Sequence, residues 1–338
     1  MGQRSERPTI LLAMMPGLLD YAFTEDQRRR LAAVGDVLND GEPLEELSSP
    51  HAAELLGRAD VLVGHWGCPT LTEAVMVAAP RLALFAYAAG TVKWQVTDAV
   101  WARHVVVTSA AAANAVPVAE YTVAAILWAN KGVFSFAARE RDPDARVPLD
   151  PTRIGNVGRR VGLVGASHVG RLVIELLRPY DLELAVADPY LSAADAAALG
   201  VQHMELDELC AWAELLSLHA PEVEATKGMI GAAQLAAMPD GATLVNTARG
   251  GLVDEAALVA ELETGRIAAV LDVTVEEPTP ADSPLRTLPN VFLTPHVAGA
   301  AGSEMVRLAE LAVEEVERWA AGEPPRYPVT AADLDRIA

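Results

Sequence analysis

Four segments in the second half of the chain carry residue types that do chemistry, and each lies at the end of a predicted strand. Because the carboxyl ends of parallel strands meet at one edge of a sheet, we expect these residues to converge there. The segments are His219-Ala220-Pro221, Asn246-Thr247-Ala248-Arg249-Gly250-Gly251, Asp272 with Glu276-Glu277-Pro278, and Thr294-Pro295-His296.

An arginine, a carboxylate and a histidine in one cleft suit a ketone or a secondary alcohol that bears a carboxylate. The guanidinium of Arg249 can bind a carboxylate through two hydrogen bonds. The imidazole of His296 can give a proton to a developing alkoxide or take one from an alcohol. A carboxylate beside that imidazole holds its tautomer and favours its charged form. His219 is a second candidate acid, although Pro221 favours a role in lining the site.

Residues 160–189 are predicted to position these groups, because they read as a βαβ unit. Val161–Val164 is a short apolar run typical of a buried parallel strand. A tight turn follows and opens a helix, and Leu182–Ala187 forms the next strand, which ends on Asp188. The turn is Gly165-Ala166-Ser167-His168-Val169-Gly170, and the helix is expected to present Val169, Leu172, Val173, Leu176 and Leu177 on its apolar face.

This βαβ unit predicts a dinucleotide site. Gly165 permits the sharp turn, and the helix N-terminus offers free N–H groups to a pyrophosphate. Asp188 can accept hydrogen bonds from an adenosine ribose and would repel a 2′-phosphate; since no arginine follows it in residues 189–192, NAD is favoured over NADP. The middle glycine of the motif is replaced by Ser167, so the alternative is a crossover whose glycines serve packing alone.

The first 108 residues also alternate strands and helices, which predicts a second parallel sheet. Their distinctive loop is Gly64-His65-Trp66-Gly67-Cys68-Pro69, whose N–H groups could hold a carboxylate; the alternative is a plain turn with a surface histidine. The expected strands are Thr9–Ala13, Val61–Val63, Leu82–Phe85 and Val105–Val107, and the expected helices are Glu25–Val34, Ala52–Leu56, Leu71–Ala78 and Val92–Trp101.

Further elements follow in the same alternating order. Asn114–Phe136 reads as one long apolar helix, and Ala138–Asn156 as a surface connection. The last helix, Ser303–Ala320, is expected to pack back on the first domain. Between them we expect helices at Asp207–Ala213, Ala232–Ala237 and Glu255–Glu263, and strands at Leu215–Leu218, Thr243–Asn246, Ala269–Asp272 and Val291–Thr294.

Length and composition limit the class of protein. A chain of 338 residues with 51% apolar residues suggests about two globular domains. Its net charge of −20 disfavours nucleic acid and anionic membranes as partners. Cys68 and Cys210 are too few for a disulfide scaffold or a zinc site, and the apolar run Ile10–Met15 is too short for a signal peptide or a membrane span. We therefore expect a cytoplasmic protein without a bound metal.

Across residues 60–320 the sequence resembles the D-2-hydroxyacid dehydrogenase family, which includes phosphoglycerate, glyoxylate, D-lactate and formate dehydrogenases. The motifs that carry the resemblance are AVPVAEYT, VGLVGASHVGR, ADPY, LHAPEVEATKGMI, LVNTARGGLVDEAAL and LDVTVEEPTPADSPLRTLPNVFLTPHVAG. The resemblance implies an α/β fold of two Rossmann-like, doubly wound domains. The expected substrate-binding domain comprises residues 1–108 and 297–338, and the expected NAD-binding domain comprises residues 109–296.

The resemblance also assigns roles to individual residues. The catalytic arginine falls on Arg249, the acid that pairs with the histidine falls on Glu277, and the acid/base histidine falls on His296, with Arg249 and His296 also contacting substrate. Main-chain groups of Trp66 and Gly67 are the expected donors to the substrate carboxylate. The expected cofactor-binding residues are Gly165, Ser167, His168, Val169, Gly170, Asp188, His219, Ala220, Pro221, Thr247, Ala248, Asp272 and His296, with Asp272 on the nicotinamide carboxamide.

This chain departs from the family pattern at a few positions. Ser167 and His168 stand where glycine and usually arginine or lysine occur, which bears on cofactor contact. Residues 88–91 differ from the usual run, which obscures the substrate, and Glu277 argues against the formate branch, which has glutamine there. The resemblance implies an NAD(H)-dependent oxidoreductase that interconverts a small 2-oxo acid and a D-2-hydroxy acid, as a homodimer. The alternative is an NADH-sensing, corepressor-like binding protein with little turnover.

Overall fold

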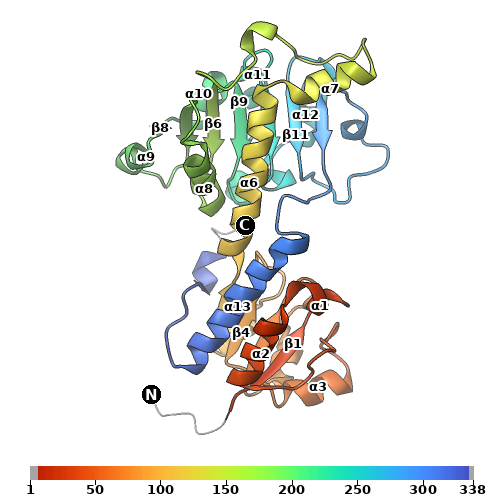
Figure 1. The fold of residues 1–338 in the computed structure, drawn as a ribbon, viewed down its shortest axis with the longest axis vertical. Coiled ribbons are helices and arrows are strands. Elements are labelled where there is room, and N and C mark those ends of the chain that lie inside the picture. The colour runs from red at the N-terminus through yellow and green to blue at the C-terminus, as the bar shows by residue number, and fades with distance from the viewer. Residues whose placement is uncertain (1–6, 335–338) are drawn as a thin grey trace. The chain divides into compact units, whose positions relative to one another are not determined.

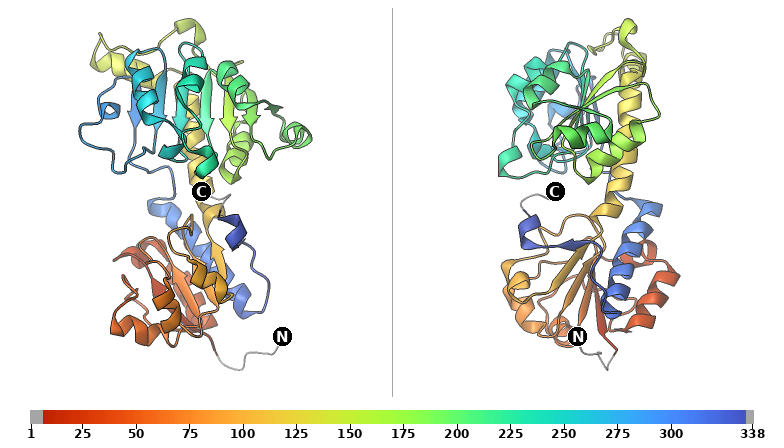
Figure 2. Two further views of the ribbon diagram at one scale, coloured as in Figure 1. Left: turned by 180° about the vertical axis from the view of Figure 1, so that it is seen from behind. Right: turned by 90° about the vertical axis from the view of Figure 1, so that its left-hand side faces the viewer.

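The structure is a computed structural model that describes residues 7–334, and the chain divides into two compact units. The first unit comprises the described residues up to Asn114 and those from Ala300 onward, and the second comprises Ala115–Gly299. The junctions fall a few residues after the boundaries expected from the sequence. Each unit is built around its own, mainly parallel sheet (Figures 1 and 2).

The sheet of the first unit has the strand order β13-β5-β4-β3-β1-β2, and only the pairing of β13 with β5 is antiparallel. Its strands are β1 (Thr9–Ala13), β2 (Asp36–Val37), β3 (Val61–Gly64), β4 (Leu84–Tyr87), β5 (Val106–Ser109) and β13 (Pro328–Val329). Its helices are α1 (Leu18–Ala22), α2 (Glu25–Val34), α3 (Pro50–Leu56), α4 (Glu73–Ala78), α5 (Asp98–Ala102) and α13 (Met305–Ala320).

Helix α13 returns to the first unit because its apolar stripe completes that unit's core. Met305, Ala309 and Val313 are buried in one cluster with residues of β1, β3 and β4, as the spacing of apolar residues in the last helix predicts. Arg30 of α2 forms ion pairs with Glu310 and Glu317 of α13. The last segment of the chain therefore folds with the first.

The second unit is a doubly wound sheet with the strand order β12-β11-β10-β9-β6-β7-β8, parallel throughout. Its strands are β6 (Arg160–Val164), β7 (Glu183–Ala187), β8 (Gln202–His203), β9 (Leu215–Leu218), β10 (Thr243–Asn246), β11 (Ala268–Leu271) and β12 (Val291–Leu293). Its helices are α7 (Val133–Arg141), α8 (His168–Leu177), α9 (Ala193–Leu199), α10 (Leu206–Trp212), α11 (Ala232–Ala237) and α12 (Glu255–Glu263), together with most of α6 (Ala111–Asn130).

Successive residues of the second unit's strands point to opposite faces of the sheet, and each face has its own core. Helices α6 and α8 bury residues such as Ile126 and Val173 against one face. Helices α10, α11 and α12 cover the other face of the sheet (Figure 2), and their Leu209, Leu235 and Leu258 are buried. By length and composition alone α6 could span a membrane; its Ala119, Ala125 and Ile126 are buried in this core.

Three of the expected helical features are wrong. The helix expected over Val92–Trp101 is confined to α5, because residues 92–97 form a loop whose backbone and side chains bond to residues 68–71. The helix expected over Asn114–Phe136 is two helices, since Gly132 adopts a left-handed φ of 66° and begins α7. That second helix extends to Arg141, into the expected surface connection. On α8, the expected face is right for Val173 and Leu177, which are buried, but Leu176 is 39% exposed and Ile174 is buried in its place.

Candidate active site

The turn after β6 admits only glycine at two positions. Gly165 has a φ of 99°, and a Cβ there would lie 2.8 Å from the nitrogen of Ala220. A Cβ on Gly170 would lie 2.2 Å from the carbonyl oxygen of Gly165. The backbone of the turn is therefore packed against the segment that follows β9, and the N-terminus of α8 points its free N–H groups outward from it.

Ser167, which replaces the expected middle glycine, is the N-cap of α8. Its hydroxyl accepts a hydrogen bond from the N–H of Gly170 at 3.4 Å and donates one to the carbonyl of His219 at 2.9 Å. The serine therefore ties the glycine turn to the end of β9. Because the proton of its hydroxyl is used in that bond, the direct donors that remain for a phosphate are backbone N–H groups.

Asp188 is fixed at the end of β7 by two backbone donors. Its Oδ2 accepts a hydrogen bond from the N–H of Ala166 at 2.7 Å, and its Oδ1 accepts one from the N–H of Tyr190 at 2.8 Å. A carboxylate has about four acceptor positions, so this side chain keeps capacity for the hydroxyls of a ribose. Its position beside the glycine turn is the one that the sequence pattern predicts.

His219 is buried and neutral beneath the same turn. Its Nε2 forms a 3.0 Å hydrogen bond with Ser217 Oγ, and burial lowers the pKa of its imidazole to about 3. Its Nδ1 is buried and has no hydrogen-bond partner among the described residues. This orphaned nitrogen belongs to a residue that adjoins Ala220 and the glycine turn, where the sequence predicts a bound dinucleotide.

Arg249 lies on a loop that is packed tightly against the next one. Asn246 at the end of β10 donates to the carbonyl of Arg249 at 2.8 Å. A Cβ on Gly250 would lie 2.1 Å from the carbonyl of Thr274, so the two loops touch backbone to backbone. Sequence reasoning missed this role of Gly250, although its place in the NTARGG motif is the signal that could have suggested it.

The charge of Arg249 is held in a partly buried position. Burial lowers the pKa of its guanidinium, while the carboxylates of Glu222 and Glu277 raise it. Its ordinary pKa lies so far above neutrality that the group stays charged. The influence of Glu277 on this pKa shows that the carboxylate acts on the guanidinium through its charge.

His296 and Glu277 form the central pair of this site. The imidazole Nδ1 of His296 lies 2.6 Å from Glu277 Oε2, and the N–H of Thr274 lies 3.4 Å from Glu277 Oε1. His296 has a φ of 56°, which is uncommon outside glycine. Because Nδ1 faces the carboxylate, Nε2 is the nitrogen that can face a substrate, and the side chain is 48% exposed.

Asp272 fixes the backbone on both sides of His296. Its buried carboxylate accepts hydrogen bonds from Thr294 Oγ1 and from the N–H groups of Val297 and Ala298, at 2.6 to 2.8 Å. Its carbonyl accepts the N–H of His296 at 2.8 Å. These contacts explain how the unusual backbone conformation of His296 is held; contact between Asp272 and a nicotinamide carboxamide stays a prediction.

The loop after β3 in the first unit differs from the expectation. The N–H of Trp66 donates to Nδ1 of its neighbour His65 at 2.7 Å, and its contact with a substrate carboxylate stays a prediction. Gly67 has a φ of 82°, and a Cβ there would lie 2.7 Å from Met15. His65 is fully buried, not on the surface as the plain-turn alternative would have it.

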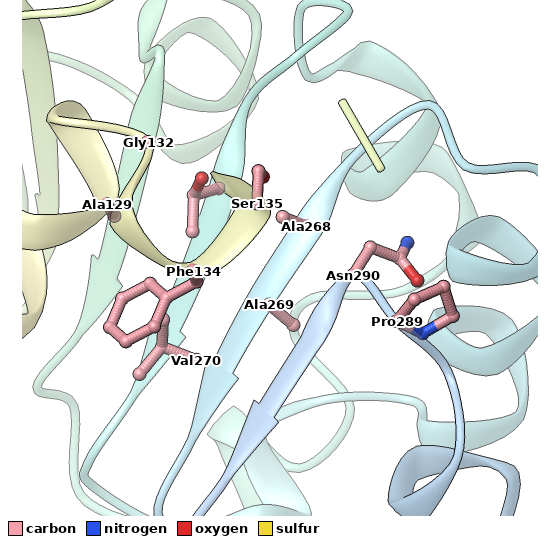
Figure 3. Close-up of a pocket in the computed structure, with 10 residues that line it drawn as sticks. Ala129, Gly132, Phe134, Ser135, Ala268, Ala269, Val270, Pro289 and Asn290 are labelled. Carbon is pink, nitrogen blue, oxygen red and sulfur yellow. The ribbon is translucent and has the colours of Figure 1, made fainter. Parts of the chain in front are cut away.

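The described residues also contain a small cavity that is separate from the predicted site. It has a volume of about 20 Å³, room for about one water molecule, and lies by the junction of α6 and α7 (Figure 3). Its lining residues are Ala129, Gly132, Phe134, Ser135, Thr243, Ala268, Ala269, Val270, Pro289 and Asn290, none of which is a predicted site residue.

Among residues 7–334 no cluster of histidine, cysteine and acidic side chains could hold a metal ion.

Taken together, the doubly wound sheet, the glycine turn and the acid after β7 define a dinucleotide-binding α/β protein. Comparison with known proteins gives the family. Residues 123–298 match the model of the D-isomer specific 2-hydroxyacid dehydrogenase NAD-binding domain. The chain belongs to the D-isomer specific 2-hydroxyacid dehydrogenase family, a family of NAD-binding oxidoreductases, and NAD is its cofactor.

Individual relatives show the extent of the similarity. The chain is 35% identical over 301 residues to D-3-phosphoglycerate dehydrogenase of Mycobacterium tuberculosis, covering 87% of this chain and 55% of the relative. It is 34% identical over 256 residues to glyoxylate reductase of Korarchaeum cryptofilum, covering 74% and 77%. The chain thus spans about half the length of the phosphoglycerate dehydrogenases that it matches. A solved structure, TT0316 protein from Thermus thermophilus, aligns with a TM-score of 0.73 at 29% identity, covering 95% of this chain and 100% of that one.

The residues present fit the cofactor. Glycine at Gly165 and Gly170 allows the tight turn against Ala220, the N-terminus of α8 can offer N–H groups to a pyrophosphate, and the fixed carboxylate of Asp188 keeps acceptor capacity beside that turn.

Proposed function

We propose that this chain catalyses the NAD-dependent interconversion of a 2-oxo acid and a D-2-hydroxy acid. The observation that carries the proposal is the 2.6 Å contact between His296 Nδ1 and Glu277 Oε2; the charge of Glu277 also raises the pKa of the Arg249 guanidinium. A carbonyl flanked by a carboxylate needs a proton at its oxygen and a cation at its carboxylate when it is reduced. This site supplies both.

In the proposed mechanism, Arg249 binds the substrate carboxylate and polarises the carbonyl. His296 donates a proton from Nε2 to the carbonyl oxygen in reduction and accepts it in oxidation. Glu277 holds Nδ1 protonated and stabilises the imidazolium. NAD, when bound, supplies the hydride chemistry at the substrate carbon. The N–H of Gly67 is the proposed main-chain donor of the first unit, and the ring of Trp66 contributes surface to the substrate site.

The residues proposed to hold the cofactor are those of the glycine turn and of the loops beside it. His168 and Val169 lie in the first turn of α8 and offer N–H groups to the pyrophosphate. Asp188 is proposed to bind the adenosine ribose and to select NAD over NADP. The residues proposed to line the nicotinamide side lie at or just after the ends of β9, β10 and β11. They are His219, Ala220, Pro221, Thr247, Ala248 and Asp272.

The direct test is NADH oxidation by the purified protein with a panel of 2-oxo acids. The proposal expects turnover with at least one acid and D-stereochemistry in the product. If tight NADH binding is measured but none of the acids is reduced at high protein concentration, the corepressor-like sensor becomes the better account. A complete Arg–Glu–His set favours chemistry, because a sensor has no need of it.

We also propose that the protein is a cytoplasmic homodimer. The buried, unpaired thiols of Cys68 and Cys210 suit a reducing compartment. For the dimer, the supporting feature is an aromatic patch on the second unit, formed by Trp128, Phe134 and Phe292; Trp128 is 55% exposed and Phe292 is 39% exposed. Such exposed aromatic patches favour association. Sedimentation of the wild type as a monomer at micromolar concentration would reject the dimer.

A further inference from the structure

Three neighbouring strand ends of the first unit present an apolar surface without a free cation. Strands β1, β3 and β4 are adjacent in the sheet, and the segments that follow them are residues 14–22, 65–72 and 88–97. Ligands of open α/β sheets bind beyond the carboxyl ends of the strands. This surface is therefore where the first unit would meet a substrate.

Hydrogen bonds join the three segments into one surface. The N–H of Met15 donates to the carbonyl of Trp66 at 2.8 Å. Thr70 Oγ1 donates to the carbonyl of Trp94 at 2.7 Å, and the N–H of Leu71 donates to the carbonyl of Gln95 at 2.7 Å. The side chains that project from these fixed segments are therefore held by backbone contacts rather than by loose loops.

The exposed side chains of these segments are mainly apolar. Met15 is 44% exposed, Tyr21 is 56% exposed and Trp94 is 75% exposed. Trp66 is partly buried and packs against the core clusters of the unit. Large exposed aromatic and thioether side chains at a ligand-binding edge favour an apolar ligand group.

The charges at this edge disfavour an anion. The three segments contain a single lysine or arginine, Lys93, and it already has an interaction partner. Helices α1, α4 and α5 start from these segments, and each has an acid in its first turn, which occupies the positive end of the helix: Asp20, Glu73 and Asp98. Buried His65 is neutral as well, since burial lowers its pKa to about 3.

The segment after β2 adds further negative charge. Its residue Leu44 accepts a hydrogen bond from the N–H of Met14 at 3.0 Å and forms a bridge with Ala13 at the end of β1. The exposed acids Glu42 and Glu45 lie on either side of Leu44 in the chain. A phosphate on the substrate carries about −1.5 to −2 charge and needs cationic donors, whereas Lys93 and the Arg28 that pairs with Asp20 already have partners.

We infer that this surface selects a 2-oxo acid with an apolar, uncharged side chain and rejects a phosphorylated one. The inference rests on the proposed function, because it concerns the side-chain end of the same substrate. It separates this chain from the D-3-phosphoglycerate dehydrogenases that it resembles, whose named substrate carries a phosphate. Met15, Trp66 and Trp94 are the proposed specificity-determining residues.

The experiment measures kcat/KM with NADH for four acids: pyruvate, 4-methyl-2-oxopentanoate, phenylpyruvate and 3-phosphohydroxypyruvate. The inference expects at least one of the two bulky apolar acids to exceed both pyruvate and 3-phosphohydroxypyruvate by about tenfold or more. Preference for 3-phosphohydroxypyruvate or for pyruvate overturns the inference and leaves the proposed function intact. Turnover of none of the acids, with NADH binding retained, overturns the proposed function and the inference with it.

Two variants test the surface itself. Met15→Arg places a cation at this edge and should raise the kcat/KM ratio of 3-phosphohydroxypyruvate to phenylpyruvate by about tenfold. The matched control is Val77→Arg, at a position 73% exposed near the end of α4 that leads away from the strand carboxyl ends. Equal shifts of the ratio in the two variants would overturn the inference. Trp94→Ala should lower kcat/KM for phenylpyruvate more than for pyruvate, and equal losses for both acids would count against it.

Discussion

The Nδ1 atom of His296 lies 2.6 Å from Oε2 of Glu277, although the two residues are 19 positions apart in the chain and lie on different loops. The contact exists because the backbone around each residue is fixed separately. Asp272 holds the segment of His296, and the N–H of Thr274 contacts the other oxygen of the Glu277 carboxylate.

Replacement of either member of this pair should reduce turnover without loss of cofactor binding. His296→Ala removes the proposed proton donor and should lower kcat by about 10²- to 10⁴-fold. Glu277→Gln keeps the shape but removes the charge, and about a tenfold or greater loss is expected. Steady-state kinetics and NADH fluorescence titration measure the two effects. Glu276→Gln is the matched control and should behave as the wild type; a comparable loss in that variant would contradict the assignment.

Gly250→Ala should damage the arginine loop more than the same change at the next residue. A Cβ on Gly250 would meet the backbone of Thr274 at 2.1 Å, whereas a Cβ on Gly251 would meet the movable carboxylate of Glu222 at 2.6 Å. We expect Gly250→Ala to cost about 1–3 kcal/mol of stability and to raise KM, because Arg249 is displaced. Gly251→Ala should cost less on both measures. Thermal denaturation and KM values check this order, and the reverse order would refute the packing argument.

Ser167→Ala should weaken cofactor binding as well as the helix. The change removes an N-cap and the bond to the carbonyl of His219, so about 1 kcal/mol of stability should be lost. The matched control is Ser49→Ala, which removes the N-cap of α3 in the first unit. Both variants should have a lower melting temperature, but only Ser167→Ala should raise the Kd for NADH. Unchanged NADH binding in Ser167→Ala would show that this serine caps α8 but does not support cofactor binding.

The burial of His65 predicts a specific loss of stability in acid. Burial lowers its pKa to about 3 in the folded state, whereas the unfolded side chain titrates near 6.5. Below pH 6.5 the unfolded state therefore binds more protons than the folded state. The free energy of unfolding falls by about 1.4 kcal/mol per pH unit until the folded pKa is reached. The stability that His65 contributes is complete above pH 6.5 and falls between pH 6.5 and 3.

His65→Asn keeps an acceptor for the N–H of Trp66 but cannot titrate. The unfolding free energy of this variant should fall less steeply with decreasing pH than that of the wild type. The difference between the two slopes should correspond to about one bound proton. His51→Asn, at an exposed position of α3, serves as the control and should leave the slope unchanged. Parallel curves of unfolding free energy against pH for the wild type and His65→Asn would show that the burial of His65 causes no loss of stability in acid.

The sequence predicted best the parts of the molecule that local patterns determine. The helix Glu25–Val34 has a capping box at Thr24 and Gln27, and the helix Glu255–Glu263 is capped by Asp254; both were predicted with the right ends. The meeting of Glu277 and His296 followed from the rule that parallel strands end at one edge, whereas the place of Arg249 beside a substrate stays a prediction. The order of the motifs added the roles of these residues.

What the sequence could not predict depends on contacts between distant segments. Residues 92–97 have an apolar pattern that suggests a helix, but their hydrogen bonds to residues 68–71 hold them as a loop. The N–H of Trp66 was expected to be free, but it donates a hydrogen bond to the imidazole of the neighbouring His65. No sequence pattern encodes the conformation of that imidazole. Gly132 carried a signal for a break, but the apolar run beyond it concealed the end of α6.

The glycine turn, the arginine loop and the His296–Glu277 pair all belong to residues 115–299, whereas the apolar strand ends belong to the other unit. In the proposed mechanism, reaction chemistry and side-chain recognition are therefore encoded in separate stretches of the gene. Exchange of the segments after β1, β3 and β4 for those of a relative offers a route to new substrate preferences in which the proton-transfer apparatus is left untouched.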